Sequence, residues 1–186
     1  MLSKNYKPKA LLFRESSFAV AELIFNNPSR TFHLRMIEKE TGLSTTAISR
    51  AISELEGERI IKVEDNPVTK NIRAYLDSDK YRYYKMAFNI YRLSTWGLIP
   101  ILRATFQNPK AIVCFGSFAK GEDLEDSDVD LLVISNKKAD LNLKNWEHWL
   151  KRKINLTVLE SVESAQDEFK NAVANGIVLE GYLKIE

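Results

Sequence analysis

The sequence predicts an α+β protein whose first part is mainly helical and whose second part contains a sheet with flanking helices. Three observations lead to this prediction. Apolar residues recur at helical spacing up to about residue 56, β-branched residues dominate the segment after Gly57, and residues 111–115 form a short apolar run typical of a buried strand. A chain of 186 residues is long enough for one large domain or two small ones.

The composition excludes several classes of site. The single cysteine, Cys114, lies in an apolar run, so neither a disulfide framework nor a cysteine-based zinc site is possible, and His33 and His148 are too isolated in sequence to suggest a histidine-rich metal site. No apolar run approaches the ~20 residues that a membrane span needs. The polar, basic start of the chain does not resemble a signal peptide, and we expect a soluble, cytoplasmic protein without membrane association.

The charge is divided unevenly along the chain. Residues 1–94 carry 16 Lys and Arg against 11 Asp and Glu, whereas residues 95–186 carry 11 against 14. A basic first half favours a polyanionic partner, without identifying it.

Two helices are predicted near the start of the chain. Apolar periodicity indicates the first over about residues 15–26, and Asn26-Asn27-Pro28 ends it. Leu34 and Ile37 begin a shorter second helix that ends at Gly42.

A third helix follows, and its two faces differ. Its N-cap is Ser44, whose hydroxyl can accept a hydrogen bond from the free amides of the first turn. One face is apolar and the other carries hydroxyl groups and an arginine. The apolar residues are Ile48, Ala51, Ile52 and Leu55, and the polar residues are Thr45, Thr46, Ser49, Arg50 and Ser53.

A two-stranded ribbon is expected after the third helix. Residues 59–64 and 70–75 have strand composition, and Asp65-Asn66-Pro67 between them is typical of a turn. The segment Glu38–Leu55 (EKETGLSTTAISRAISEL), in this order of elements, resembles the helix-turn-helix core of winged transcription regulators. The resemblance covers about residues 14–78 and implies a mostly helical winged helix-turn-helix domain with a β-wing.

This resemblance implies binding to double-stranded DNA and a role in transcription regulation. The residues expected to contact DNA lie at the start of the third helix and are Ser44, Thr45, Thr46, Ser49 and Arg50, since short hydroxyl residues and arginine suit phosphates and base edges. An ordinary exposed helix face and a protein-binding face are the alternatives. On the wing, Lys62, Lys70 and Arg73 suit phosphate contacts or simple solvation.

Helical segments are expected between the two parts of the chain. Residues 79–94 carry Tyr84, Phe88 and Tyr91 at i, i+4, i+7 spacing, which is typical of a core or a dimer seam. This stripe, together with the usual pairing of winged helices on two half-sites, predicts a homodimer. We expect a first domain at residues 1–80, a helical linker at 81–108 and a second domain at 109–186.

The residues most indicative of chemistry follow the predicted strand Ala111–Phe115. Gly116 and Ser117 come directly after it, where backbone amides and a hydroxyl can meet a phosphate and no glycine side chain blocks the approach. The next strand contains Asp128 and Asp130, which alternation places on one face. Paired carboxylates suit a hard cation such as Mg²⁺. A solvated acidic loop is the alternative.

The string GSFAKGEDLEDSDVDLLVI resembles the signature of polymerase-β-like nucleotidyltransferases, especially the minimal ones. The match consists of Gly116 and Ser117, a ten-residue interval, and then Asp128 and Asp130. The resemblance covers about residues 95–186 and implies a mixed sheet with flanking helices. It also implies that Gly116 and Ser117 bind the triphosphate of an NTP, with ATP the first candidate, and that Asp128 and Asp130 are catalytic and bind Mg²⁺.

One position departs from this family pattern. The family's third carboxylate corresponds to Asn155, which can coordinate through its carbonyl oxygen but cannot act as a general base. Glu160, at the end of the same predicted strand, is the nearest alternative. Two functions therefore stay open. One is Mg²⁺-dependent transfer of a nucleoside monophosphate to an unknown acceptor, such as a protein, coupled to a DNA-binding winged helix. The other is a non-catalytic transcriptional regulator that senses nucleotide.

Overall fold

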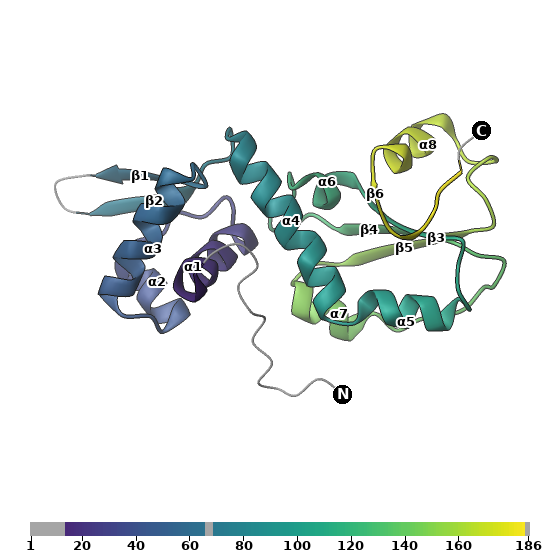
Figure 1. Cartoon of the computed structure of the whole chain (residues 1–186), viewed down its shortest axis with the longest axis horizontal. Helices are drawn as coiled ribbons and strands as arrows, with labels where there is room; N and C mark the ends of the chain where they lie inside the picture. Colours follow the sequence, from purple (N-terminus) through teal and green to yellow (C-terminus); the bar gives the residue numbers. More distant parts are fainter. Residues whose placement is uncertain (1–13, 66–68, 185–186) are drawn as a thin grey trace. The chain divides into compact units, whose positions relative to one another are not determined.

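The chain divides into two compact units, one ending at Phe88 and the other beginning at Asn89 (Figure 1). The structure is a computed structural model that describes residues 14–65 and 69–184. Both units contain helices and strands, which confirms the predicted α+β class. The boundary lies within one helix, α4 (Asp79–Thr95), and not in a loop. The range 81–108, expected as a linker, contains most of α4 and all of α5 (Leu98–Thr105).

Three helices begin the first unit: α1 (Glu15–Asn26), α2 (Leu34–Thr41) and α3 (Thr45–Gly57). The turn between α2 and α3 forms for local reasons. Gly42 ends α2 in the left-handed conformation, with φ of 70°, and its N–H donates to the Glu38 carbonyl at 2.8 Å. The Ser44 hydroxyl then accepts from the Ala47 N–H at 3.3 Å, and this caps α3 as the sequence predicted.

A two-stranded antiparallel ribbon completes the predicted order of elements. It consists of β1 (Ile61–Asp65) and β2 (Lys70–Ala74), and the predicted turn residues Asn66 and Pro67 lie outside the described residues. Phe32, ahead of α2, bridges to Ile72 of β2 and ties the ribbon to the helices.

The core of the first unit is aromatic and aliphatic. The ring of Phe25 on α1 lies 5.5 Å from that of Tyr81 and 5.2 Å from that of Phe88, between centroids. Phe88, from the predicted aromatic stripe, therefore packs within the unit. The apolar face of α3 is buried, as its spacing predicted, and comprises Ile48, Ala51, Ile52 and Leu55.

The second unit is built on a four-stranded mixed sheet with the order β5-β4-β3-β6. Its strands are β3 (Ala111–Phe115), β4 (Val129–Ile134), β5 (Ile154–Leu159) and β6 (Ile177–Gly181). β3 is antiparallel to both β4 and β6, whereas β4 and β5 are parallel. The sheet is mixed, as the family resemblance implied.

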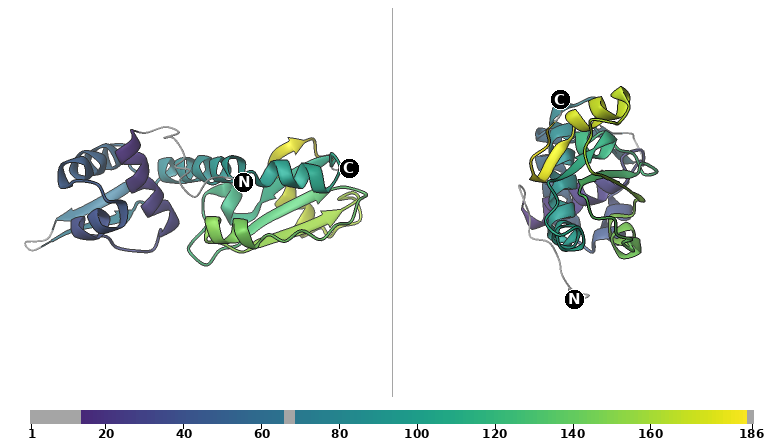
Figure 2. Two further views of the ribbon diagram at one scale, coloured as in Figure 1. Left: turned by 90° about the horizontal axis from the view of Figure 1, so that it is seen from below. Right: turned by 90° about the vertical axis from the view of Figure 1, so that its right-hand side faces the viewer.

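Helices cover both faces of this sheet (Figure 1, Figure 2). One face packs against the end of α4, α5, α6 (Gly116–Lys120) and α7 (Lys144–Leu150), and the other packs against α8 (Asp167–Ala174). β3 supplies both cores because its side chains alternate between the two faces, and all five of its residues are buried. No helix among residues 14–65 and 69–184 is long and apolar enough to cross a membrane.

A buried polar network joins three segments of the second unit. The Asn89 amide on α4 donates to Asp123 Oδ1 at 2.7 Å and to the Phe118 carbonyl at 2.8 Å. The guanidinium of Arg152, just before β5, lies 3.6 Å from Asp123 Oδ2, with the two side chains only 4% and 1% exposed. The network therefore anchors the loop that leads to β4.

Candidate functional site

The turn after β3 brings backbone close to a carboxylate. Gly116 has φ of 74°, and a Cβ atom at this position would lie 2.5 Å from Asp130 Oδ2. Glycine is thus required here both for the left-handed backbone and for the space beside Asp130. Ser117 follows at the start of α6 and is half-buried. The predicted phosphate-binding residues therefore lie next to one of the predicted metal ligands.

Asp128 and Asp130 lie on the same face of the sheet. Asp130 is the second residue of β4 and pairs with Phe115 of β3, while Asp128 immediately precedes the strand. Val129 between them is 0% exposed and points into the opposite core, whereas both aspartates are half-buried. The carboxylates share the face that α8 covers further along the sheet.

Asn155 connects the two aspartates. The parallel register of β4 and β5 pairs Asn155 with Asp130. Its amide nitrogen, Nδ2, donates to Asp128 Oδ2 and to Asp130 Oδ1, each at 3.1 Å. The third polar side chain of the site is therefore an amide that bridges both carboxylates.

Glu160 does not join this group. It follows β5, whose last residue, Leu159, pairs with Ile134 at the far end of β4. Glu160 lies five positions beyond Asn155 along this extended segment, which corresponds to about 16 Å. Within the described part of the chain, no group of three or more His, Cys, Asp or Glu side chains could hold a metal ion. The acidic donors of the site are Asp128 and Asp130.

The cysteine of β3 lies close to the site but has no nucleophilic role in it. Burial, and to a smaller extent the charge of Asp130, raises the pKa of Cys114 to about 12. Its thiol is 0% exposed and stays protonated at neutral pH.

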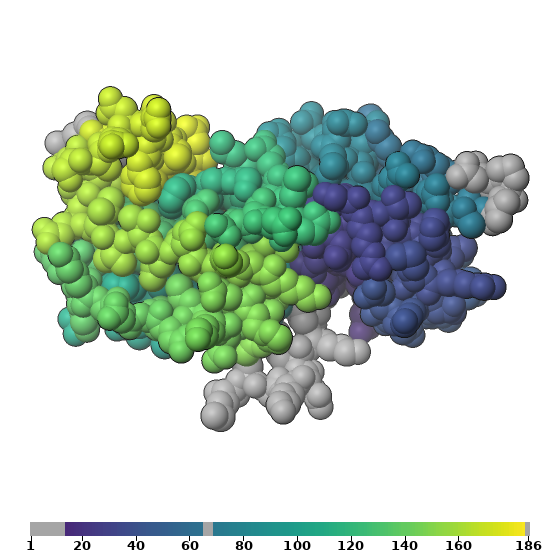
Figure 3. Space-filling view, turned by 180° about the vertical axis from the view of Figure 1, so that it is seen from behind, coloured from purple at the N-terminus to yellow at the C-terminus, as the bar shows by residue number. Residues whose placement is uncertain are grey.

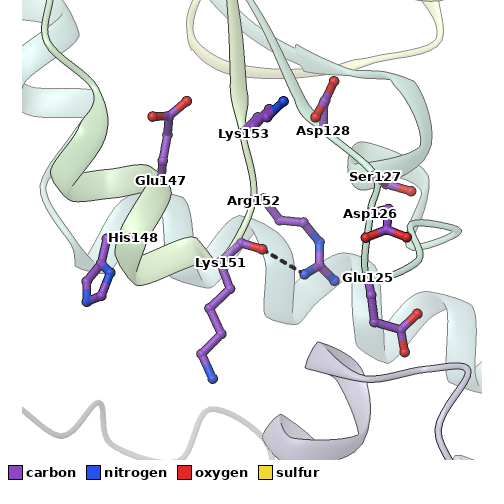
Figure 4. Close-up of a pocket in the computed structure, with 9 residues that line it drawn as sticks. All are labelled: Glu125, Asp126, Ser127, Asp128, Glu147, His148, Lys151, Arg152 and Lys153. Atoms are coloured by element: carbon purple, nitrogen blue, oxygen red, sulfur yellow. Dashed lines mark hydrogen bonds between the residues drawn. The ribbon is translucent and has the colours of Figure 1, made fainter.

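A polar hollow of about 660 Å³ opens beside Asp128 (Figure 4). Two segments line it, the loop of residues 125–128 before β4 and, at the junction of α7 and β5, residues 147–148 and 151–153. Its charges are mixed, and Lys153 extends toward Asp128 in Figure 4. In the space-filling view, the green-to-lime residues that include α7 and β5 cover a broad surface of the second unit (Figure 3).

Apart from Asp128, the sequence did not identify the residues of this hollow as parts of a site. They form no motif, and only the parallel pairing of β4 with β5 brings them beside Asp128. The pair Val129–Ile154 implies that Lys153 lies next to Asp128. These residues could have been identified from the sequence only by predicting the register between β4 and β5 correctly.

The residues expected to contact DNA are all exposed in the first unit, and two of them also have structural roles. Ser44 caps α3, and the Thr45 hydroxyl donates to Glu38 Oε1 at 3.2 Å. Thr46, Ser49 and Arg50 project from the polar face of α3. The first turns of α3 thus present hydroxyl groups and one guanidinium at the surface.

The wing cations Lys62 and Arg73 contact neighbouring side chains within the unit. Lys62 Nζ lies 3.3 Å from Asp77 Oδ2 and 4.0 Å from the centroid of the Tyr75 ring. The Arg73 guanidinium donates to the Thr31 hydroxyl at 2.8 Å. Simple solvation therefore does not describe these side chains.

The comparison with known proteins identifies a family for most of the second unit. Residues 97–179 match the family described as "Nucleotidyltransferase domain", and the matched range contains Gly116, Ser117, Asp128, Asp130 and Asn155. No curated protein and no solved structure matches the chain. The family match confirms the resemblance to nucleotidyltransferases for this part of the chain. At the level of the family, it supports nucleotidyl transfer.

Proposed function

We propose that the protein is a Mg²⁺-dependent nucleotidyltransferase that transfers a nucleoside monophosphate from an NTP, with ATP the first candidate, to an acceptor. One observation carries the proposal. Asp128 and Asp130 lie together on one face of the sheet, beside the Gly116-Ser117 turn, in a segment that matches the nucleotidyltransferase family.

The donor set fits Mg²⁺. This ion is held in such enzymes by one or two carboxylates, by substrate phosphates and by water. Asp128 and Asp130 would supply the carboxylates, and Asn155 lies within hydrogen-bonding distance of both. When bound, Mg²⁺ would offset the negative charge of the phosphates and of the leaving pyrophosphate.

The protein's own residues would bind and orient the nucleotide. Backbone amides at Gly116 and the Ser117 hydroxyl suit the phosphate oxygens, since the glycine leaves the backbone accessible. In the reaction, an acceptor oxygen bonds to the α-phosphorus, and the bond from that phosphorus to the bridging oxygen breaks. Pyrophosphate leaves with the electron pair. The acceptor's proton passes to a carboxylate or to water, because the Asn155 amide cannot accept it.

We assign the acceptor to the hollow beside Asp128. A volume of about 660 Å³ admits a side chain with its flanking backbone, and the mixed charges of the lining favour a polar acceptor. A protein is the first candidate.

The first unit would act as a winged helix-turn-helix that binds double-stranded DNA as a homodimer. The order of its elements and the exposed polar start of α3 support this assignment. The second candidate function is that of a non-catalytic transcriptional regulator, in which the second unit senses nucleotide without turning it over. Asn155 in place of a third carboxylate favours that candidate.

Labelled nucleotide separates the two functions. The chain is incubated with ATP labelled at the α-phosphate, Mg²⁺ and cell lysate, and transfer of label to an acceptor is measured. Asp128→Asn/Asp130→Asn should abolish transfer. Asp140→Asn, which removes an exposed carboxylate elsewhere in the same unit, should retain it. Nucleotide binding by the wild type without transfer to any acceptor would favour the sensor and contradict the enzyme.

A further inference from the structure

The amide of Asn155 occupies a position between the two carboxylates of the site. Both of its hydrogen-bonding distances, to Asp128 Oδ2 and to Asp130 Oδ1, are 3.1 Å. The NH₂ group of asparagine is a donor of two hydrogens and not a cation ligand, since only the carbonyl oxygen of the amide coordinates. In this arrangement Asn155 thus presents hydrogens to two of the oxygens that a cation would use.

The bridging amide is also favourable for the acidic pair. Asp128 and Asp130 are half-buried on one face of the sheet, where two like charges repel. Two N–H groups from a single side chain offset part of that repulsion and hold the carboxylates at a fixed separation. Asn155 itself is exposed on β5, the edge strand of the sheet, so its amide has space to rotate.

A cation that arrives alone therefore meets two obstacles. It must displace the bridging amide, and it finds two carboxylates where a third would have strengthened binding. A nucleotide triphosphate removes the second obstacle, because its phosphates supply further oxygen ligands and negative charge.

We propose that Asn155 is a positioning residue whose amide cross-links Asp128 and Asp130 and makes metal binding depend on nucleotide. The inference rests on the proposed nucleotide site. It assigns to Asn155 the task of keeping the site closed to free divalent cations, so that metal and nucleotide bind together. By linkage, metal must strengthen nucleotide binding by the same factor by which nucleotide strengthens metal binding.

Binding of Mn²⁺ to the full chain tests this assignment without a measurement of activity. Free Mn²⁺ is followed by electron paramagnetic resonance, with and without α,β-methylene-ATP, in which a methylene group replaces the oxygen of the bond that nucleotidyl transfer breaks. The Mn²⁺ that the nucleotide binds by itself is measured without protein and subtracted. For the wild type, nucleotide should raise the Mn²⁺ affinity by at least about tenfold, or about 1.4 kcal/mol. Without nucleotide, Asn155→Asp should bind Mn²⁺ at least about tenfold more tightly than the wild type, because it adds a carboxylate and removes both donors.

Two further variants isolate the cause. Asn142→Asp makes the same chemical change at an exposed asparagine outside the site and should leave Mn²⁺ binding unchanged. Asn155→Ala removes the cross-link without adding charge, so the ratio of the affinities with and without nucleotide should fall toward one. A wild type that binds Mn²⁺ equally well in both conditions would overturn the inference. A ratio unchanged in both Asn155 variants would also overturn it.

The result is distinguishable from failure of the proposed function. Coupled binding of Mn²⁺ and nucleotide without transfer to any acceptor would leave the role of Asn155 intact and contradict the enzyme. Transfer of label by a chain whose Mn²⁺ binding is independent of nucleotide would support the enzyme and contradict the role of Asn155.

Discussion

The two units differ in how their candidate functional residues are assembled. In the first unit these residues lie on consecutive turns of one helix, α3, whose opposite face forms the core. In the second unit they come from the turn after β3, the start of β4 and the start of β5, and a buried polar network anchors the intervening loop. On the exposed face of one helix, a substitution changes one side chain and leaves its neighbours in place. A site assembled from several strands depends instead on the packing beneath it.

The largest expected effect is a loss of stability of the second unit when its buried polar network is broken. Arg152→Met removes the cation that lies beside buried Asp123, and loss of one partner from a buried ion pair costs about 3–5 kcal/mol. We expect that loss in the free energy of unfolding of the second unit. All three tryptophans, Trp96, Trp146 and Trp149, belong to this unit, so their fluorescence in a urea titration reports on it.

The matched control is Arg103→Met. Arg103 pairs with Glu180 at the surface of the same unit, and an exposed pair contributes little to stability because solvent and salt screen it. If the free energy of unfolding falls by the same small amount in both variants, the buried network does not support the site. The contrast between the two units would then weaken.

The second effect concerns the contact between backbone and carboxylate at Gly116. Gly116→Ala adds a Cβ that would lie 2.5 Å from Asp130 Oδ2, and it also forces alanine into a left-handed conformation. Displacement of Asp130 should lower nucleotidyl transfer by about 100-fold, since small misplacements of reacting groups have effects of this size. The measurement is the rate of label transfer from ATP.

Gly97→Ala separates the two causes. Gly97 has φ of 73°, and a Cβ atom there would meet nothing within 4 Å. The control thus carries the same backbone strain, about 1–2 kcal/mol, without the clash. An equal loss of transfer in both variants would attribute the effect to strain and argue against a tight Gly116–Asp130 contact.

Features set by local sequence could be predicted. Ser44 caps its helix and Gly42 ends the preceding one because the physical causes lie within a few residues. Alternation along a strand likewise placed Asp128 and Asp130 on one face, and the apolar run Ala111–Phe115 is a strand with the predicted bounds.

Features set by strand pairing could not be predicted. The hydrogen bonds from Asn155 to the aspartates join residues 25 and 27 positions apart. The contact between Asn89 and Asp123 spans 34 positions. No local pattern encodes such contacts, because the order of the strands decides which segments meet. The sequence therefore identified Asn155 as a departure from the family pattern, without indicating that its amide bridges the pair.

The smallest expected effect tests the first unit. Arg50 is exposed on the polar face of α3, so Arg50→Ala should leave the folded unit unchanged. Loss of one contact to a phosphate should weaken duplex binding by about five- to tenfold and reduce the slope of log affinity against log salt by about one. Fluorescence anisotropy with labelled duplexes at several salt concentrations measures both. Arg103→Ala removes the same charge from the second unit and should leave the slope unchanged. If Arg50→Ala and Arg103→Ala weaken binding equally, the effect is one of net charge and not of a surface on α3, and α3 would then be a candidate for binding a protein partner.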